Sequence, residues 1–448
     1  MELIAPQWIA PVEPAATVLH DHAVAIEGER IVAVLPVRQA RQAWPDAAVT
    51  EMPGHLLVPG FVNLHTHVPM TLLRGAGDDL PLERWLRERI WPLEAALISP
   101  EFVADGAVLA CAEMLLGGIT CFSDMYFYPE EVARAALDMG MRAAVGIIVI
   151  EFGSPYGSGA AEYIRKGLEL RDQLRDEPRI RFTLAPHAPY TVSDDSFRRV
   201  ASLAAELAMP VQCHVHETLT EISDSLAQHG KRPLRWLADL GLLGPDFIAI
   251  HAVHLDDADL ALLARQGAVV AHCPHSNLKL ASGIAPTARM RAAGIPVGIG
   301  TDGAASNNRL DLLAEARTAS LLAKGSSGDA TAWPAHETLH AMTLAGARAL
   351  GLGDQLGSIT AGKQADLVAI DLSEARTLPV FEPVAQLVYG AGRDQVSAVW
   401  VAGKVVVHER QLAGQQAVSR LGEVVARTRL WHNRIVETLP AGLRLSGA

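Results

Sequence analysis

The chain of 448 residues has few cysteines and few positive charges. Lys and Arg number 38 against 50 Asp and Glu, and no basic run occurs, so we expect no nucleic-acid partner. The four cysteines include no C-x-x-C pair, which excludes a disulfide framework and a thiolate zinc site. We expect all four to be reduced core residues: Cys111, Cys121, Cys213 and Cys273.

Long apolar runs are also missing. No window reaches the length of a membrane span, and the first residues, MELIAPQWIAPVEP, have no basic region before an apolar core. We therefore expect no membrane partner and a cytoplasmic location. The formal net charge of −12 favours a neutral or cationic small molecule as the partner. Half of the residues are hydrophobic, which permits a large core and excludes a disordered protein.

Both ends of the chain alternate apolar and polar residues around glycine-containing turns. The stretches are VLHDHAVAIEGERIVAVLP near the start, and GKQADLVAIDL and VSAVWVAGKVVVHERQL near the end. This period of two is typical of hairpins with one buried face. Because neither end is long enough to form a domain alone, we expect residues 1–58 and 357–448 to form one β-sandwich, with a terminal helix in the second part.

The middle of the chain, residues 59–356, contains eight short apolar runs separated by stretches of helical length. The runs are GFVNLHTH, ITCFSDMYF, RAAVGIIVI, IRFTLAPH, PVQCHVH, FIAIH, AVVAHCP and IPVGIGTD. Such runs are typical of parallel strands that are covered on both faces. Eight of them predict an α/β fold with a (β/α)₈ TIM barrel, whose active site lies at the C-terminal ends of the strands.

Histidine and aspartate occur where these runs stop. His65 and His67 end the first run, His214 ends the fifth and Asp302 ends the eighth. Residues two apart on a strand face the same side, so the first two imidazoles would lie together at the barrel mouth. Three His and one Asp suit a catalytic zinc ion, one per subunit, although manganese or iron could use the same ligands.

The stretch CHVHETLTE leaves a choice of ligand, because His214 and His216 could both face inward. His214 is favoured, since Glu217 could then turn back over the site as a proton-transfer group. His251 could bind the metal or hydrogen-bond the attacking water, and the second role is favoured. Asp302 could also accept the proton of that water.

Two other motifs suggest different functions. GIGTDG fits the dinucleotide pattern G-x-G-x-x-G, but no strand follows it to complete a βαβ unit. HETLH, residues 336–340, fits the zinc-peptidase signature, but no third ligand follows and the neighbouring Leu339, Met342 and Leu350 predict a packing face. A zinc peptidase and a non-catalytic scaffold are therefore rival interpretations. Three histidines are expected to be structural or pocket-lining: His254, His272 and His275.

Seven motifs in order along the chain resemble one family. PGFVNLHTH, RWLRERIWPLE, APHAPYTVS, CHVHET, CPHSNLKLASG, GTDGAASNN and GSITAGKQADLVAID resemble the amidohydrolase superfamily, in the TRZ/ATZ branch that contains the 5'-methylthioadenosine/S-adenosylhomocysteine deaminases. The resemblance covers nearly the whole chain. It implies a barrel with a single zinc ion, a β-sandwich built from both termini, and four metal ligands: His65, His67, His214 and Asp302.

The same resemblance implies roles for further residues. Glu217 matches the group that protonates the purine ring, and His251 matches a residue near the hydrolytic water. Glu94 matches a carboxylate that holds the ribose hydroxyls, which is reasonable because a carboxylate can accept from both hydroxyls of a diol. Three other nucleoside contacts are implied: His187, Trp85 and Ser306.

The implied reaction is the hydrolytic deamination of an adenine nucleoside at C6, a cleavage of a C–N bond in a cyclic amidine. The expected substrates are 5'-methylthioadenosine and S-adenosylhomocysteine, which give an inosine-type product and ammonia. Zinc would lower the pKa of water to about 7, Asp302 would accept a proton, and Glu217 would protonate N1. The rival within the superfamily acts on guanine, an oxidised purine or an s-triazine, none of which has a ribose diol for Glu94.

The sequence does not rank these two nucleosides against adenosine. Several apolar residues could form walls for a 5' thioether: Pro69, Met70, Leu73, Met125 and Phe127. A chain of this apolar type is also expected to form a homo-oligomer.

Overall fold

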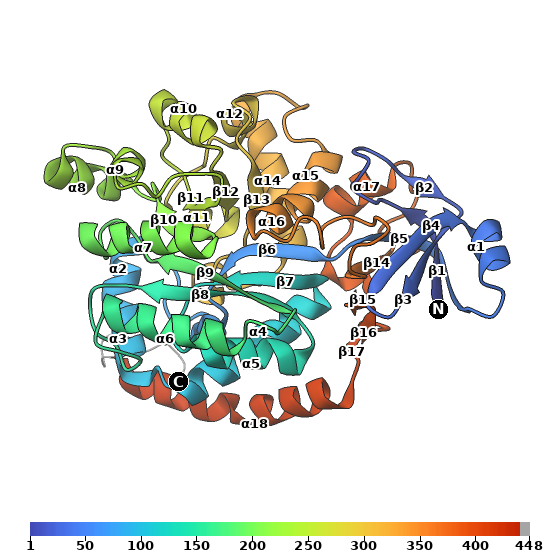
Figure 1. The fold of residues 1–448 in the computed structure, drawn as a ribbon, viewed down its shortest axis with the longest axis horizontal. Coiled ribbons are helices and arrows are strands. Elements are labelled where there is room, and N and C mark those ends of the chain that lie inside the picture. Colours follow the sequence, from blue (N-terminus) through green and yellow to red (C-terminus); the bar gives the residue numbers. More distant parts are fainter. Residues whose placement is uncertain (440–448) are drawn as a thin grey trace.

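A computed structural model describes residues 1–439, and it consists of a barrel with a large sheet beside it (Figure 1). Eight parallel strands are hydrogen-bonded in chain order around the barrel. They are β6 (Phe61–Thr66), β7 (Ile119–Asp124), β8 (Arg142–Val149), β9 (Ile180–Pro186), β10 (Val211–Val215), β11 (Phe247–His251), β12 (Val269–His272) and β13 (Val297–Ile299). Every predicted apolar run contains one of these strands, so the TIM-barrel prediction is confirmed.

Glycines close the barrel where its first and last strands meet. A Cβ atom on Gly298 would lie 2.6 Å from Leu64, and one on Gly300 would lie 2.8 Å from the backbone nitrogen of His65. The Asp302 N–H donates to the His65 carbonyl at 2.9 Å across the same seam. The glycines of GIGTDG therefore permit close approach of two strands, and a short helix, α13 (Ala304–Asn307), follows them.

Helices cover the outside of the barrel. After β7 to β11 come α5 (Pro129–Met139), α6 (Ala160–Gln173), α7 (Asp194–Leu207), α8 (Leu219–His229), α9 (Pro233–Asp239) and α10 (Asp257–Gln266). After β12 and β13 come α11 (Pro274–Lys279), α12 (Thr287–Ala292), α14 (Leu312–Ser327), α15 (Ala335–Ala341) and α16 (Leu344–Ala349). Helix α7 shows why they form, because Ser193 caps its first turn and its buried residues recur every third position: Phe197, Val200 and Leu203.

Strands from both chain ends form a second sheet. Its order is β17 (Gln411–Leu412), β16 (Lys404–His408), β15 (Val396–Val401), β14 (Leu367–Asp371), β5 (Ala48–Pro59), β1 (Glu2–Ile9), β3 (His22–Glu27) and β4 (Arg30–Pro36), with β2 (Leu19–His20) on β1. Helix α1 (Val37–Ala43) follows β4. The prediction that both ends build one β domain is confirmed. Because β14 pairs directly with β5, the strands belong to one connected sheet rather than to two separate ones.

The sheet is joined to the barrel at the N-terminal ends of the barrel strands. Gly60 alone separates β5 from β6, and a Cβ atom there would lie 2.2 Å from the Thr120 hydroxyl. Arg142, the first residue of β8, donates through Nε to the carboxylate of Asp366 at 2.9 Å, and both side chains are buried. This arrangement leaves the C-terminal ends of the strands free for a site (Figure 1).

The connection after β6 is long and lies over the barrel mouth. It comprises the 3₁₀-helix η1 (Val68–Leu73), α2 (Leu82–Trp85), the π-helix η2 (Leu86–Ile90) and α3 (Trp91–Leu97). We call residues 68–97 the covering segment. Helix α4 (Pro100–Leu116) follows it, and three short helices lie between β14 and β15: α17 (Pro383–Ala385), η3 (Gln386–Gly390) and η4 (Arg393–Gln395).

The terminal helix α18 (Gln415–Thr438) runs along the outside of the barrel, against α3, α4 and α5 (Figure 1). The buried carboxylate of Asp105 on α4 accepts from Arg427 Nε at 2.8 Å and from Trp431 Nε1 at 2.9 Å. A terminal helix was predicted, and residues 440–448 of that prediction lie outside the described part of the chain.

Helix α4 is apolar because it is enclosed between the barrel and α18. Eleven of its 17 residues are buried. Within residues 1–439, no single helix has the length and apolar composition needed to cross a membrane, although the bent pair Leu82–Leu97 and Pro100–Leu116 meets both criteria when taken together.

Candidate active site

Five predicted residues converge at the C-terminal ends of the barrel strands. Asp302 Oδ1 lies 3.5 Å from His65 Nε2 and 3.3 Å from His67 Nε2. His214 Nε2 lies 3.2 Å from His65 Nε2, and His251 completes a second triad with these two residues. Within each triad, the possible ligand atoms lie within 4.8 Å of one another. The structure therefore brings together the four predicted metal ligands and also His251.

The hydrogen bonds of the histidines show that this cluster fits a cation. His67 Nδ1 donates to the Met125 carbonyl at 2.5 Å, and His214 Nδ1 donates to the His187 carbonyl at 2.7 Å. Because a carbonyl only accepts, each Nδ1 carries the hydrogen and each Nε2 presents a lone pair to the cluster. Lone pairs that face one another and a carboxylate oxygen repel, so a divalent metal with nitrogen and oxygen ligands, such as zinc, suits this set.

The protonation states agree with metal binding. Burial lowers the pKa of His65 to about 4 and also lowers the pKa values of His67 and His214, which favours the neutral imidazoles that metals bind. Burial opposes the ionisation of Asp302, yet the adjacent His65 and His67 side chains hold its pKa well below the usual range. The cluster thus offers three neutral nitrogens and one anionic oxygen.

Two serines hold the Asp302 carboxylate from behind. Oδ2 accepts from Ser276 at 2.6 Å and from Ser306 at 2.8 Å, while Oδ1 accepts from the Gly303 N–H at 2.7 Å. Ser306 had been predicted to contact the nucleoside. It is buried beneath Asp302 and is not among the described residues that line the cavity.

Glu217 lies one turn beyond β10, beside this cluster. Its Oε1 accepts from the Ser282 hydroxyl at 3.2 Å, and its Oε2 lies 3.7 Å from His251 Nε2. His251 Nδ1 donates in turn to Asn277 Oδ1 at 2.8 Å. Burial raises the pKa of Glu217, which favours the protonated form that can act as a proton donor.

One short segment thus supplies partners for three side chains of the site. Ser276 and Asn277 belong to α11, and Ser282 follows it closely. Their partners are Asp302, His251 and Glu217, respectively. These contacts could not be predicted from the sequence, because a single hydroxyl or amide that lies behind a site has no pattern of its own.

The remaining predicted histidines have other partners. His216 Nδ1 donates to the His254 carbonyl at 3.1 Å, and its Nε2 accepts from the Leu234 N–H at 3.1 Å, so neither nitrogen is available to a metal. His275 pairs with Glu315 at 2.8 Å. His272 is buried, with its ring centroid 6.2 Å from that of Trp333.

The HETLH motif lies on helix α15, away from this cluster. His336 Nε2 lies 3.5 Å from Glu382, and Glu337 is paired with Arg291. Leu339, Met342 and Leu350 are buried, as expected for a packing face. The acid of the motif is therefore engaged in an ion pair.

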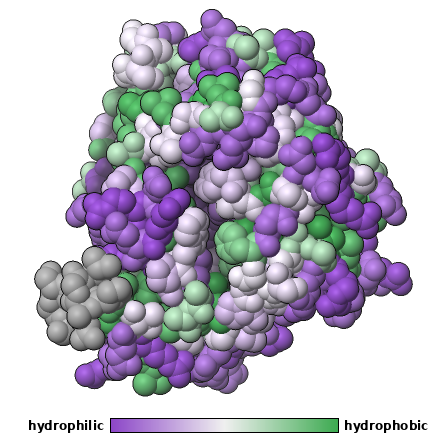
Figure 2. Space-filling view, turned by 90° about the vertical axis from the view of Figure 1, so that its left-hand side faces the viewer, coloured by the Kyte–Doolittle hydropathy of each residue, from purple (hydrophilic) through white to green (hydrophobic). Residues whose placement is uncertain are grey.

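A cavity opens above the cluster. Figure 2 views the barrel mouth and shows a hollow near its centre. His67, His214, Glu217, His251 and Asp302 line the cavity floor or sides, together with Trp85, Glu94 and His187. Of the five apolar residues that were expected to form cavity walls, three line this cavity: Met70, Met125 and Phe127. Four aromatic lining residues were not predicted from the sequence: Trp91, Tyr126, Phe152 and Tyr190.

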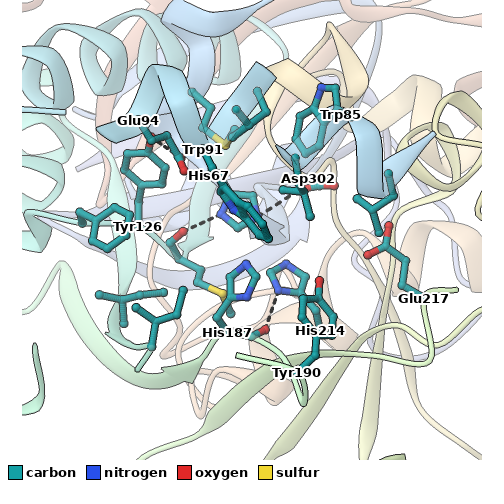
Figure 3. A pocket seen from close by; sticks show the side chains of 18 of the residues that line it. His67, Trp85, Trp91, Glu94, Tyr126, His187, Tyr190, His214, Glu217 and Asp302 are labelled. Carbon is teal, nitrogen blue, oxygen red and sulfur yellow. Dashed lines mark hydrogen bonds and ion pairs between the residues drawn. The ribbon is translucent and has the colours of Figure 1, made fainter. Parts of the chain in front are cut away.

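Glu94 lies across the cavity from Glu217 (Figure 3). The Tyr126 hydroxyl donates to its Oε1 at 2.8 Å. Burial raises the pKa of Glu94 to about 7, and this hydrogen bond acts in the opposite direction. Tyr126 lies two residues beyond β7, so the rule that sites lie at strand ends could have identified it.

The covering segment supplies the aromatic side of the cavity. Trp85 is 5% exposed, and its Nε1 has no hydrogen-bond partner among the described residues. The π-helix η2 separates Trp85 from Trp91 and Glu94, and π-turns are frequent at functional sites. An unpaired indole N–H beside a cavity is suited to a polar ligand atom.

His187 contributes both to the cluster and to the cavity. Its Nδ1 lies 3.0 Å from the Thr191 hydroxyl, which itself donates to the Ala188 carbonyl at 3.1 Å. The imidazole therefore carries its hydrogen on Nδ1 and presents a lone pair at Nε2. Burial lowers the pKa of His187 to about 3, so the ring is neutral.

A second, more open cavity adjoins the first. Four residues line both: Trp91, Glu94, Phe127 and Phe152. Ala95, Ile98 and the loop at residues 153–158 complete its wall. Among the described residues that line it, none is Lys or Arg, so the cavity is apolar apart from Glu94, two serines and backbone groups.

The chain is similar to known proteins over nearly its whole length. The model of the Amidohydrolase family matches residues 56–406. A 5-methylthioadenosine/S-adenosylhomocysteine deaminase of Teredinibacter turnerae is 47% identical over 428 residues, which is 96% of each chain.

Two solved structures show the same fold. An adenosine deaminase from Xanthomonas campestris with bound zinc has a TM-score of 0.94 and 50% identity, and covers 97% of this chain and 98% of its own. An atrazine chlorohydrolase, TrzN from Arthrobacter aurescens, crystallised with zinc, has a TM-score of 0.86 and 26% identity, and covers 96% of this chain and 100% of its own.

Proposed function

Because the chain belongs to the amidohydrolase family, we propose that it is a zinc-dependent deaminase of adenine nucleosides. Its substrates are 5'-methylthioadenosine and S-adenosylhomocysteine, which are named for its relative of 47% identity. The products are the inosine-type nucleoside and ammonia. The observation that carries this proposal is the placement of Glu217 beside the histidine–aspartate cluster and of Glu94 across the same cavity.

Four residues are proposed as the metal ligands: His65, His67, His214 and Asp302. The convergence of their lone pairs supports this set. When bound, zinc supplies a Lewis acid and lowers the pKa of water to about 7. His251 is placed to hydrogen-bond the attacking water, because its Nδ1 is bonded to Asn277 and its Nε2 faces the cluster near Glu217.

The proposed reaction is a hydrolysis, in which the water oxygen bonds to C6 of the purine and the bond between C6 and the exocyclic nitrogen breaks. Two carboxyl groups carry the protons. Asp302 accepts the proton of the attacking water, and Ser276 and Ser306 hold its carboxylate in place. Glu217 gives a proton to ring N1, so that C6 becomes open to attack. Asp302 then passes the water's proton to the exocyclic nitrogen, which leaves as ammonia, and Glu217 regains a proton from the new C6 hydroxyl.

The ribose is held on the opposite side of the cavity. Glu94 accepts hydrogen bonds from the two ribose hydroxyls, and Tyr126 fixes the orientation of its carboxylate. Trp85 and His187 line the same cavity. The unpaired Trp85 Nε1 and the His187 Nε2 lone pair are proposed as a donor and an acceptor for the nucleoside.

The adjoining cavity is suited to the 5' substituent. It shares Glu94 and Phe152 with the first cavity, and its described lining offers no cationic side chain to a carboxylate. An uncharged thioether therefore suits it better than an amino-acid chain. We accordingly propose 5'-methylthioadenosine as the preferred substrate.

The test compares nucleoside with free base in wild type and Glu94→Gln. Loss of the adenine absorbance band and ammonia release measure deamination. A charge-assisted hydrogen bond contributes about 1.5–3 kcal/mol, so kcat/KM for the nucleoside should fall roughly 10–100-fold, while turnover of free adenine stays the same. Equal effects on both substrates, or wild-type activity on triazines alone, would contradict the proposal.

The protein is also proposed to self-associate. Large apolar side chains are exposed, among them Phe381 at 93% and Leu430 at 57%. Light scattering of the purified protein measures the number of subunits, and a monomer at all concentrations would contradict this expectation.

A further inference from the structure

Glu221 lies behind the turn that carries Glu217, and we propose that it is a positioning residue for this proton donor. The inference rests on the proposed function, in which Glu217 protonates the purine ring. Strand β10 ends at Val215, and the next residue, His216, has a left-handed φ of 57°. The chain therefore turns sharply just before Glu217, and something must hold this turn.

The Glu221 carboxylate holds two consecutive backbone amides of the turn. Its Oε1 accepts from the His216 N–H at 2.7 Å, and its Oε2 accepts from the Glu217 N–H at 2.9 Å. Each Glu221 oxygen thus accepts from one backbone N–H of the turn. Burial raises the pKa of Glu221 to about 8, and these two hydrogen bonds act in the opposite direction. The direction in which the Glu217 side chain leaves the backbone is thereby fixed.

This arrangement differs from an ordinary helix cap. Glu221 is the third residue of α8, and its N–H donates to the hydroxyl of the cap residue Thr218 at 3.2 Å. In a capping box, a glutamate at this position bonds back to the N–H of the cap residue itself. Here it reaches past Thr218 to the two preceding residues, so its side chain serves the catalytic turn.

The side chain of Glu217 is itself held by few contacts. Ser282 donates to it at 3.2 Å and His251 lies 3.7 Å away. The two backbone amides therefore carry much of its placement. Glu221 is 6% exposed and is not among the described residues that line the cavity, so it acts through Glu217 rather than on the substrate.

The experiment compares Glu221→Ala and Glu221→Gln with Thr218→Ala. The control loses the helix cap but keeps both amide bonds to Glu221. A misplacement of about 1 Å can cost roughly 100-fold in rate, so Glu221→Ala should lose about that much in kcat with KM changed less than about threefold. Glu221→Gln keeps one acceptor oxygen and should fall between it and wild type. Thr218→Ala should melt earlier yet keep kcat within about twofold.

A second readout does not depend on activity. Hydrogen exchange of the peptide at residues 213–218 reports the amides of His216 and Glu217. Exchange should be faster in both Glu221 variants and unchanged in Thr218→Ala. Melting, zinc content and exchange are measured on the same samples.

Each outcome decides a separate question. Glu221 variants that melt early but keep kcat and amide protection would overturn the inference and make Glu221 a helix-stabilising residue only. Should Glu221→Ala fail to fold, Glu221→Gln is judged by the same criteria. If the wild type deaminates no nucleoside, the proposed function is wrong, and the exchange data alone then support or overturn the role of Glu221 in holding the turn.

Discussion

The metal cluster and the covering segment differ in how their polar atoms are satisfied. In the cluster, His67 and His214 donate to backbone carbonyls, and Asp302 accepts from two serines. In the covering segment, Trp85 Nε1 has no partner among the described residues, and Glu94 receives the Tyr126 hydroxyl. Most hydrogen-bonding atoms of the cluster are thus held by the protein, although His65 Nδ1 has no partner among the described residues. The proposed recognition groups retain hydrogen-bonding capacity for a substrate.

Removal of a proposed metal ligand should have the largest effect on activity. His65→Ala should abolish both zinc binding and deamination, because it removes the nitrogen that lies between His214 and Asp302. Zinc content by atomic emission and turnover by ultraviolet absorbance check this. The matched control is His336→Ala in the HETLH motif, which should retain both, and loss of zinc there would revive the peptidase interpretation.

Loss of the proton donor should be the next largest effect. Glu217→Gln keeps the hydrogen bond from Ser282 but removes the acidic carboxyl proton. General acid catalysis contributes about 10²–10⁴-fold, so kcat should fall by that factor. Zinc content should be unchanged. A variant with full zinc and near-normal kcat would show that another group protonates the ring.

Ionisation of Glu94, the proposed ribose-binding residue, should make kcat/KM for nucleosides depend on pH. Since burial raises the pKa of Glu94 to about 7, its acid form predominates below that pH. Only the carboxylate accepts from both hydroxyls, so kcat/KM for a nucleoside should fall about tenfold per unit as pH drops below about 7. Tyr126→Phe removes a hydrogen bond that lowers this pKa and should move the limb to higher pH. A limb that persists in Glu94→Gln would assign it to another group.

The lining of the adjoining cavity predicts a preference between the two proposed substrates. Its described lining has no Lys or Arg, so S-adenosylhomocysteine must place charged groups without a cationic partner. We expect kcat/KM for 5'-methylthioadenosine to exceed that for S-adenosylhomocysteine by about tenfold or more. Phe152→Arg should narrow this ratio. Equal values for the two substrates in the wild type would place the 5' substituent elsewhere.

Ser306→Ala should have the smallest effect. It distinguishes a hydrogen-bond partner of Asp302 from a contact of the nucleoside. Its single hydrogen bond to Asp302 predicts a loss of about 1 kcal/mol, or roughly fivefold, in Ser306→Ala. The loss should lie in kcat and match that of Ser276→Ala, which removes the other hydroxyl. A change confined to KM would instead support the predicted contact with the nucleoside.

The sequence predicted the fold from patterns that reflect burial. Each barrel strand is buried over most of its length, which is why its apolar run was visible. His65, His67 and Asp302 were recognisable because they end such runs. The G-x-G-x-x-G pattern had a different cause, since Gly298 and Gly300 are required for close contact between the first and last strands.

Other features had no local pattern to reveal them. Ser282 lies 65 residues from Glu217 along the chain, and only the barrel brings them together. Trp91 and Tyr126 looked like ordinary apolar residues until the covering segment placed them on the cavity. The single connected sheet also depends on one long-range pairing, between β14 and β5, which alternation alone cannot specify.

The pairing of β14 with β5 also sets an order of events during synthesis on the ribosome. Pro59 at the end of β5 pairs with Leu367, which is made roughly 300 residues later and therefore, at about 5–20 residues per second, roughly 15–60 seconds later. One edge of the N-terminal strands has no partner for that interval, and such edges attract other chains. The β5 edge therefore stays open to pairing with other chains until β14 has been synthesised.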